Sequence, residues 1–279
     1  MSRVNRISLF VDMAGQRNRK FDGNPRVTAA AVALPTADLD DIRAQLPTNL
    51  SKWEQLTEET ARSVVEMLSR RAVAVAAATV NRDTEAWTKA LVDAEILHSQ
   101  IASESRAKAG WAKLPIVLSY ELLSRACFLA IAHFLRENRS IRILDSQGLQ
   151  VVECRVVCDE EFSGGENIEV FKSFWNDEHI PAKKLATLGF RVRHPDVKLT
   201  TEKDEPLLLL ADISAGLVHS ANLPNPGRLA MPLPCAVSRK LLDPLRAKRL
   251  LSIDAFDFHM NYDEVFGSAM EEAPARNDA

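Results

Sequence analysis

The stretch Ile7-Ser8-Leu9-Phe10-Val11-Asp12 is a short apolar run that ends in a carboxylate. A polar, positively charged segment (15–26) follows it, and then a second apolar run (27–34) that stops at Pro35. Apolar runs of this length, bounded by polar or proline-containing segments, are typical of buried strands. We therefore expect a strand, a long loop and a second strand that returns antiparallel beside the first.

Helices and further strands are expected to alternate along the rest of the chain. The predicted strands that follow are residues 72–80, 141–145, 151–157 and 190–199. The predicted helices follow Pro35 and Thr57 and continue at 84–139, 207–221 and 238–251. This alternation predicts one α/β domain over residues 1–267, with a helical insertion at 84–139 and a disordered tail at 268–279.

The composition argues against several classes of function. Only 10 of the 279 residues are glycine, and the sequence contains neither the glycine-rich motif of dinucleotide-binding proteins nor that of P-loop NTPases. The formal net charge is −3, which argues against a protein that binds nucleic acid by bulk positive charge alone. If this protein binds phosphates, another source must supply the positive charge.

The cysteines and the N-terminus point to a cytoplasmic protein. The four cysteines form no C-x-x-C pair, so we expect reduced structural thiols and no zinc site. The N-terminal apolar run is too short for a signal peptide or a membrane span.

Two aspartates close predicted strands. Asp12 ends the run quoted above and, because side chains alternate along a strand, shares a face with Ser8 and Phe10. Asp145 ends a predicted strand in the same way. If these strands run parallel and adjacent, both carboxylates lie at one edge of the sheet, where open α/β sheets bind ligands. The alternative for each aspartate is a turn-forming role.

Asp212 lies inside a strongly apolar predicted helix, Leu207-Leu-Leu-Leu-Ala-Asp-Ile-Ser-Ala-Gly216. Leu208 and Gly216, one turn to either side, leave its helix face apolar or small. An ionised carboxylate buried there needs a cation, hydrogen bonds or a shifted pKa. Two alternatives follow: a metal ion shared with Asp12 and Asp145, or a hydrogen bond to a backbone or hydroxyl group.

Oxygen-only ligation by Asp12, Asp145 and Asp212 suits Mg²⁺ or Mn²⁺. Such ions beside a phosphodiester would activate a water molecule and stabilise the leaving oxygen. They would also supply the positive charge that the composition lacks. The three aspartates therefore predict the catalytic metal site of a Mg²⁺- or Mn²⁺-dependent nuclease.

The segments around two of these aspartates are Val11-Asp12-Met13-Ala14-Gly15 and Leu208-Leu-Leu-Ala-Asp-Ile-Ser-Ala-Gly216. They are similar to a strand ending D-E-S-G and a late helix reading L-Q-x-A-D-x-x-A-G. On these residues the chain resembles the bacterial domain-of-unknown-function family three thousand eight hundred. The resemblance implies a ribonuclease H-like fold, with a mixed sheet flanked by helices, and a setting in mobile elements or phage defence.

The sequence departs from this pattern at three positions. Met13, Ala14 and Leu209 stand where the family has Glu, Ser and Gln, so one acid of the first motif is absent. Ribonuclease H-like nucleases add a fourth carboxylate from a helix. Glu121 and Glu66 are the candidates for this role, and Glu121 is alternatively the partner of Arg125 one turn later.

Basic residues follow the first motif directly. Arg17, Arg19 and Lys20 are expected either to contact a nucleic-acid backbone or to form a solvated loop. The leading prediction is a nuclease with nucleic acid as its partner. The alternatives are a nucleic-acid-binding module that does not cleave, and a catalytically degenerate ribonuclease H-like protein whose buried helices support a homo-oligomer or a protein complex.

Overall fold

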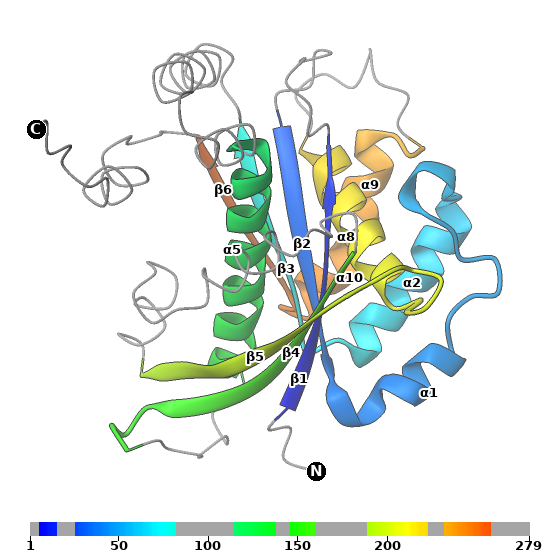
Figure 1. Cartoon of the computed structure of the whole chain (residues 1–279). Coiled ribbons are helices and arrows are strands. Elements are labelled where there is room, and N and C mark those ends of the chain that lie inside the picture. The colour runs from blue at the N-terminus through cyan, green and yellow to red at the C-terminus, as the bar shows by residue number, and fades with distance from the viewer. Residues whose placement is uncertain are drawn as a thin grey trace, which may run out of the picture.

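One mixed sheet of six strands, in the order β5-β4-β1-β2-β3-β6, forms the centre of the fold (Figure 1). The computed structural model describes residues 6–15, 26–81, 114–137, 146–159, 189–222 and 232–257. The strands are β1 (Arg6–Ala14), β2 (Arg26–Pro35), β3 (Ala74–Asn81), β4 (Gln150–Asp159), β5 (Phe190–Thr200) and β6 (Leu251–Asp257). The helices are α1 (Leu39–Ala44), α2 (Glu58–Arg71), α5 (Leu114–Glu137), α8 (Leu208–Ala221), α9 (Cys235–Leu241) and α10 (Asp243–Ala247). Two short 3-10 helices are η1 (Thr36–Asp38) and η2 (Trp53–Gln55).

Strand β2 runs antiparallel to the other described strands. It pairs antiparallel with β1 and β3, whereas β4 pairs parallel with β1, β5 with β4, and β6 with β3. The register of β1 and β2 runs from Ile7 beside Pro35 to Ala14 beside Thr28. The antiparallel return predicted for the first two strands is confirmed, and so is the α/β class.

Alanine-rich strands allow the centre of the sheet to lie between two layers of helices. The fully buried cross-strand pairs of β2 and β3 include four made of alanine alone: Ala29 with Ala78, Ala30 with Ala77, Ala31 with Ala76, and Ala33 with Ala74. Because protein interiors are closely packed, a small side chain on each face lets a helix approach the backbone of the sheet. The alanines of these two strands therefore allow helices to pack closely on both faces of the sheet.

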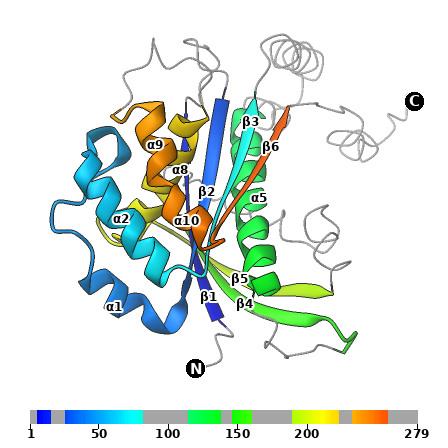
Figure 2. The same ribbon diagram turned by 180° about the vertical axis from the view of Figure 1, so that it is seen from behind.

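The two faces of the sheet are covered by different helices, as the opposite views of Figures 1 and 2 show. Helix α5 packs on the face formed by Ile7, Leu9 and Val11 of β1. Helix α8 packs on the face formed by Phe10 and Ala14, and α2, α9 and α10 belong to the same layer. The described part of the predicted helical insertion, α5, is thus a layer of the core.

The C-terminal part of the described chain differs from the prediction of one helix over 238–251. Helix α9 ends at Leu241, and α10 begins at Asp243 with Pro244 in its first turn. Proline lacks an N–H and tolerates only the start of a helix, so it separates the two helices. Arg249 then takes a positive φ of 55°, and the chain enters β6, a strand that the sequence analysis missed.

Two other predictions concern the cysteines and the membrane. All four cysteines are free thiols, as expected. In the part of the chain that the structure describes, no helix combines the length and apolarity needed to cross a bilayer. The predicted strand at 141–145 and the tail at 268–279 lie outside the described residues.

Candidate metal centre

Three neighbouring parallel strands bring acidic residues to one edge of the sheet. In the register of β1 and β4, Val11 lies beside Cys158, so Asp12 and Asp159 are the next residues of the two strands. In the register of β4 and β5, Asp159 lies beside Thr200, and Glu202 follows two residues later. The carboxyl ends of parallel strands are where open α/β sheets bind ligands.

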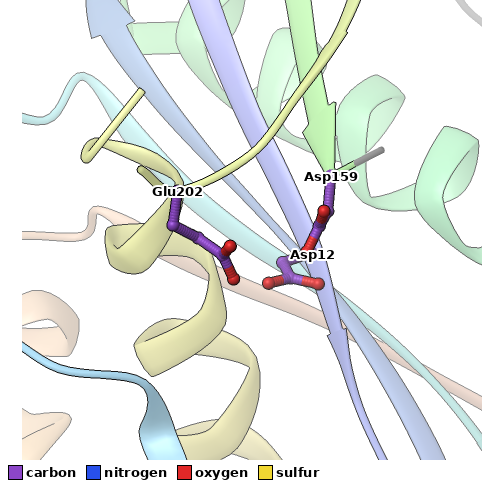
Figure 3. A group of neighbouring side chains, drawn as sticks. All are labelled: Asp12, Asp159 and Glu202. Carbon is purple, nitrogen blue, oxygen red and sulfur yellow. The ribbon is translucent and has the colours of Figure 1, made fainter. Parts of the chain in front are cut away.

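The carboxylates of Asp12, Asp159 and Glu202 converge at this edge (Figure 3). One oxygen from each lies within 4.8 Å of the others. Asp12 and Asp159 are each only 5% exposed, and the Glu202 side chain is 15% exposed. Like charges this close and this poorly hydrated repel one another, so a cation is the natural partner of the acidic cluster formed by these three residues.

The backbone next to Asp12 orients its carboxylate. The N–H of Met13 donates a hydrogen bond of 2.7 Å to Asp12 Oδ1. The side chain of Met13 itself belongs to the opposite face of the sheet, which is covered by α5. The residue that replaces the expected Glu of the first motif is therefore part of the core, and its side chain does not face the acidic cluster.

Glu202 has a cationic neighbour. The Nζ atom of Lys52, the residue that precedes η2, lies 2.5 Å from Glu202 Oε1. Burial alone would raise the pKa of Glu202. The hydrogen bond and charge of Lys52, the backbone N–H of Glu202 and a side-chain hydrogen bond with Asp159 outweigh burial and lower this pKa. Glu202 is therefore held in the ionised form that a metal ligand needs.

Asp212 makes a different contact. The backbone N–H of Trp53 donates a hydrogen bond of 2.6 Å to Asp212 Oδ2. Burial raises the pKa of Asp212 to about 6, supported by the charges of Glu54 and Glu202 and opposed by Trp53 N–H and Lys52. Among the described residues, Asp212 does not belong to the group whose oxygens lie within metal-bridging reach. Of the two alternatives for Asp212, the hydrogen bond to a backbone group is therefore present.

Gly216, one helical turn after Asp212, contacts the ring of the same tryptophan. A Cβ atom at Gly216 would lie 2.1 Å from Trp53 Cδ2, so only glycine leaves room for the indole. Asp212 and Gly216 therefore both hold Trp53 in place, one through its backbone N–H and the other through its ring. These two contacts account for the Asp and the Gly of the segment A-D-x-x-A-G in α8 without a metal ion.

The other predicted site residues lie elsewhere. Asp145, Arg17, Arg19 and Lys20 fall outside the described residues. Glu66 is exposed on α2, and Glu121 belongs to α5, which covers the face of the sheet opposite α8.

Sequence reasoning missed Asp159 and Glu202. Among the described strands, the parallel neighbour of β1 is β4, which ends at Asp159. The signal for Asp159 was available, because Val151-Val-Glu-Cys-Arg-Val-Val-Cys-Asp159 is another apolar run that ends in a carboxylate. Glu202 lies in the polar stretch Thr201-Glu-Lys-Asp-Glu205 and has no such local signal.

Comparison with known proteins gives no matching family model and no matching curated protein. The family resemblance of the two motifs therefore stays a prediction.

Proposed function

We propose that this protein is a Mg²⁺- or Mn²⁺-dependent phosphodiester hydrolase acting on nucleic acid, with Asp12, Asp159 and Glu202 as the metal ligands. The observation that carries this proposal is the convergence of three carboxylates, within 4.8 Å, from three adjacent parallel strands. The sequence predicted Asp12, Asp145 and Asp212 as ligands, whereas the proposed set combines Asp12 with Asp159 and Glu202.

The topology supports a ribonuclease H-like fold as part of this proposal. The order β3-β2-β1-β4-β5, with β2 alone antiparallel among these strands, is the arrangement expected of a ribonuclease H-like sheet. Strand β6 extends the sheet beyond β3. The acidic cluster then lies at the ends of the central strand β1 and its two parallel neighbours.

The donor set fits a hard divalent cation. All three donors are carboxylates, and Mg²⁺ and Mn²⁺ prefer such oxygens together with water and substrate phosphate. When bound, the ion would generate a reactive hydroxide and stabilise the charge on the leaving oxygen. The protein's own part is to keep Asp12 oriented through Met13 N–H and to keep Glu202 ionised through Lys52.

The ion pair between Lys52 and Glu202 also favours a second candidate. A lysine ammonium neutralises part of the acidic cluster without any metal. This contact fits a catalytically degenerate protein that binds nucleic acid, or a protein partner, without cleaving it. The two candidates differ in whether a divalent ion binds at the cluster.

The test is titration calorimetry with Mn²⁺, combined with cleavage assays on single-stranded, duplex and hybrid substrates. Wild type is expected to bind Mn²⁺ and to cleave at least one substrate. Asp12→Asn and Asp159→Asn are expected to lose both, and Glu66→Gln, an exposed acid on α2, serves as the matched control. Nucleic-acid binding without Mn²⁺ binding or cleavage would favour the second candidate and refute the first.

A further inference from the structure

The segment Lys52–Trp53 joins α8 to the acidic cluster. Its first residue contacts Glu202 through Nζ, and its second residue contacts Asp212 through the backbone N–H. The two contacts thus connect Asp212, which is not one of the three clustered acids, to the cluster.

The hydrogen bond to Asp212 constrains Lys52 as well as Trp53. The N–H of Trp53 belongs to the peptide bond between the two residues, and this bond is planar. Fixing the N–H direction therefore fixes the orientation of the Lys52 carbonyl and limits where its side chain begins. The Trp53 ring is held at the same time by its contact with Gly216 and is only 4% exposed.

The position of the Lys52 side chain suits a ligand that arrives from solvent. Its side chain is 49% exposed, although its Nζ atom lies 2.5 Å from the largely buried Glu202 carboxylate. An ammonium group carries three donors and serves as a point charge for phosphate oxygens. An anionic substrate that approaches three carboxylates needs positive charge beside them, and the protein supplies it here.

We propose that Asp212 is a positioning residue that acts through the backbone of Trp53 to hold the Lys52 ammonium beside Glu202, where Lys52 binds a phosphate oxygen of the substrate. The phosphate contact rests on the proposed function. The positioning of Lys52 does not, because it concerns contacts within the metal-free protein. Asp212 then has a different role from the metal ligand expected from the sequence.

The first experiment tests the positioning without metal or substrate. Lysine reactivity toward an amine-acylating reagent is measured by mass spectrometry in the chelator-treated protein. Wild-type Lys52 is expected to react slowly, and Glu202→Gln and Asp212→Ala are expected to accelerate it severalfold. Asp212→Asn retains a carbonyl oxygen that accepts the Trp53 N–H, so it is expected to react like wild type. Equal acceleration in Asp212→Asn and Asp212→Ala, or none in either, would overturn the positioning role.

The second experiment separates substrate binding from chemistry. Lys52→Met, which changes a half-exposed side chain, and Asp212→Ala are each expected to raise KM for an oligonucleotide about tenfold, with a smaller change in kcat. Asp212→Asn is expected to rescue most of the loss. In the Lys52→Met background, Asp212→Ala is expected to raise KM little further, because the two substitutions remove the same interaction. A full Asp212→Ala effect in that background, or an unchanged KM in Lys52→Met, would refute the proposal.

The two experiments keep the two proposals apart. If wild type neither binds Mn²⁺ nor cleaves, the proposed function and the phosphate contact fail, while the labelling result still decides the role of Asp212. If wild type binds Mn²⁺ and Asp212→Asn abolishes that binding, Asp212 is a ligand and the positioning role is wrong. Thermal unfolding of each variant identifies any that fails to fold.

Discussion

Asp12 and Asp159 follow directly on Val11 and Cys158, which are paired in the register of two parallel strands, and their carboxylates lie at one edge of the sheet (Figure 3). Both strands are central, so neither carboxylate can move away without disturbing the core. The pair and Glu202 therefore form a preorganised acidic cluster. The cost of bringing these charges together is met by the packing of the sheet and by Lys52.

The electrostatic free energy of the acidic cluster predicts how Asp159→Asn changes the stability of the protein. Without metal, the variant is expected to be more stable than wild type by about 1 kcal/mol, because its amide keeps a donor for the hydrogen bond to Glu202 while an acidic group is removed from a poorly hydrated cluster. Wild type is expected to gain about 2.7 kcal/mol when Mn²⁺ is present at a hundredfold excess over its Kd, and the variant is expected to lose this gain. Denaturant unfolding with and without Mn²⁺ measures both effects.

The control for this prediction is Glu66→Gln, which removes an exposed acid on α2. It is expected to match wild type in both conditions. An Asp159→Asn variant that keeps the full Mn²⁺-dependent gain would show that the metal binds elsewhere.

The pKa of Asp212 predicts a pH dependence of stability. Burial raises this pKa to about 6, above the unfolded value, so between pH 4 and 6 the folded state binds more protons than the unfolded state. Stability contributed by protonated Asp212 is therefore present at low pH and is lost as pH rises through about 6. The free energy of unfolding of Asp212→Asn minus that of wild type should rise by about 2–3 kcal/mol over this window.

Denaturant unfolding at several pH values, in the presence of a chelator, measures this difference. Taking the difference in the free energy of unfolding between Asp212→Asn and wild type removes the contributions of the other acids. Glu202 is one of these acids, and because its pKa is lowered in the folded state, its contribution to stability is lost as pH falls. A difference that stays constant from pH 4 to 7 would contradict the buried, raised-pKa state of Asp212.

The contact between Gly216 and Trp53 predicts an unusual effect of Gly216→Ala. Within a helix, alanine normally stabilises relative to glycine by about 1 kcal/mol. Here the new Cβ atom would lie 2.1 Å from Trp53 Cδ2, so the substitution is expected to destabilise by about 1–3 kcal/mol. Thermal or denaturant unfolding measures the sign.

A double-mutant cycle with Trp53→Ala is the control. Trp53→Ala alone is costly because the ring is buried, but in that background Gly216→Ala should cost little or should stabilise. If Gly216→Ala destabilises equally in both backgrounds, the indole is not the cause.

Much of the fold follows from the sequence because local patterns determine it. The apolar runs at β1 and β2 are short and bounded by polar segments, and Thr57 accepts a hydrogen bond from the Thr60 N–H at the start of α2, as its position predicts. Strand β6 was missed because its partner is β3, more than 170 residues earlier in the chain. Its pairing depends on the whole sheet, and the preceding helical residues hide the boundary.

The candidate site was predictable only where one strand defines it. Asp12 ends a strand, and its place on the face of Phe10 follows from alternation alone. Recognising Asp159 as its neighbour requires knowing which strand pairs with β1, and Glu202 becomes part of the site only through the register of β5. Asp212 was correctly recognised as a buried acid that needs a partner, but the partner lies 159 residues away in sequence.

The charge of the protein predicts how nucleic-acid binding responds to salt and to chelation. With a net charge of −3, few ionic contacts to phosphate are expected beyond those made by the metal and Lys52. For about two such contacts, raising salt from about 50 to 200 mM should weaken binding only about tenfold, whereas chelation at constant ionic strength should weaken it more.

Fluorescence anisotropy with a labelled, non-hydrolysable oligonucleotide in Mn²⁺ measures both responses. Lys52→Met should reduce the slope of log Kd against log salt by about one. A steep salt dependence that chelation leaves unchanged would mean that basic side chains, and not a metal held by Asp12, Asp159 and Glu202, recognise the phosphates.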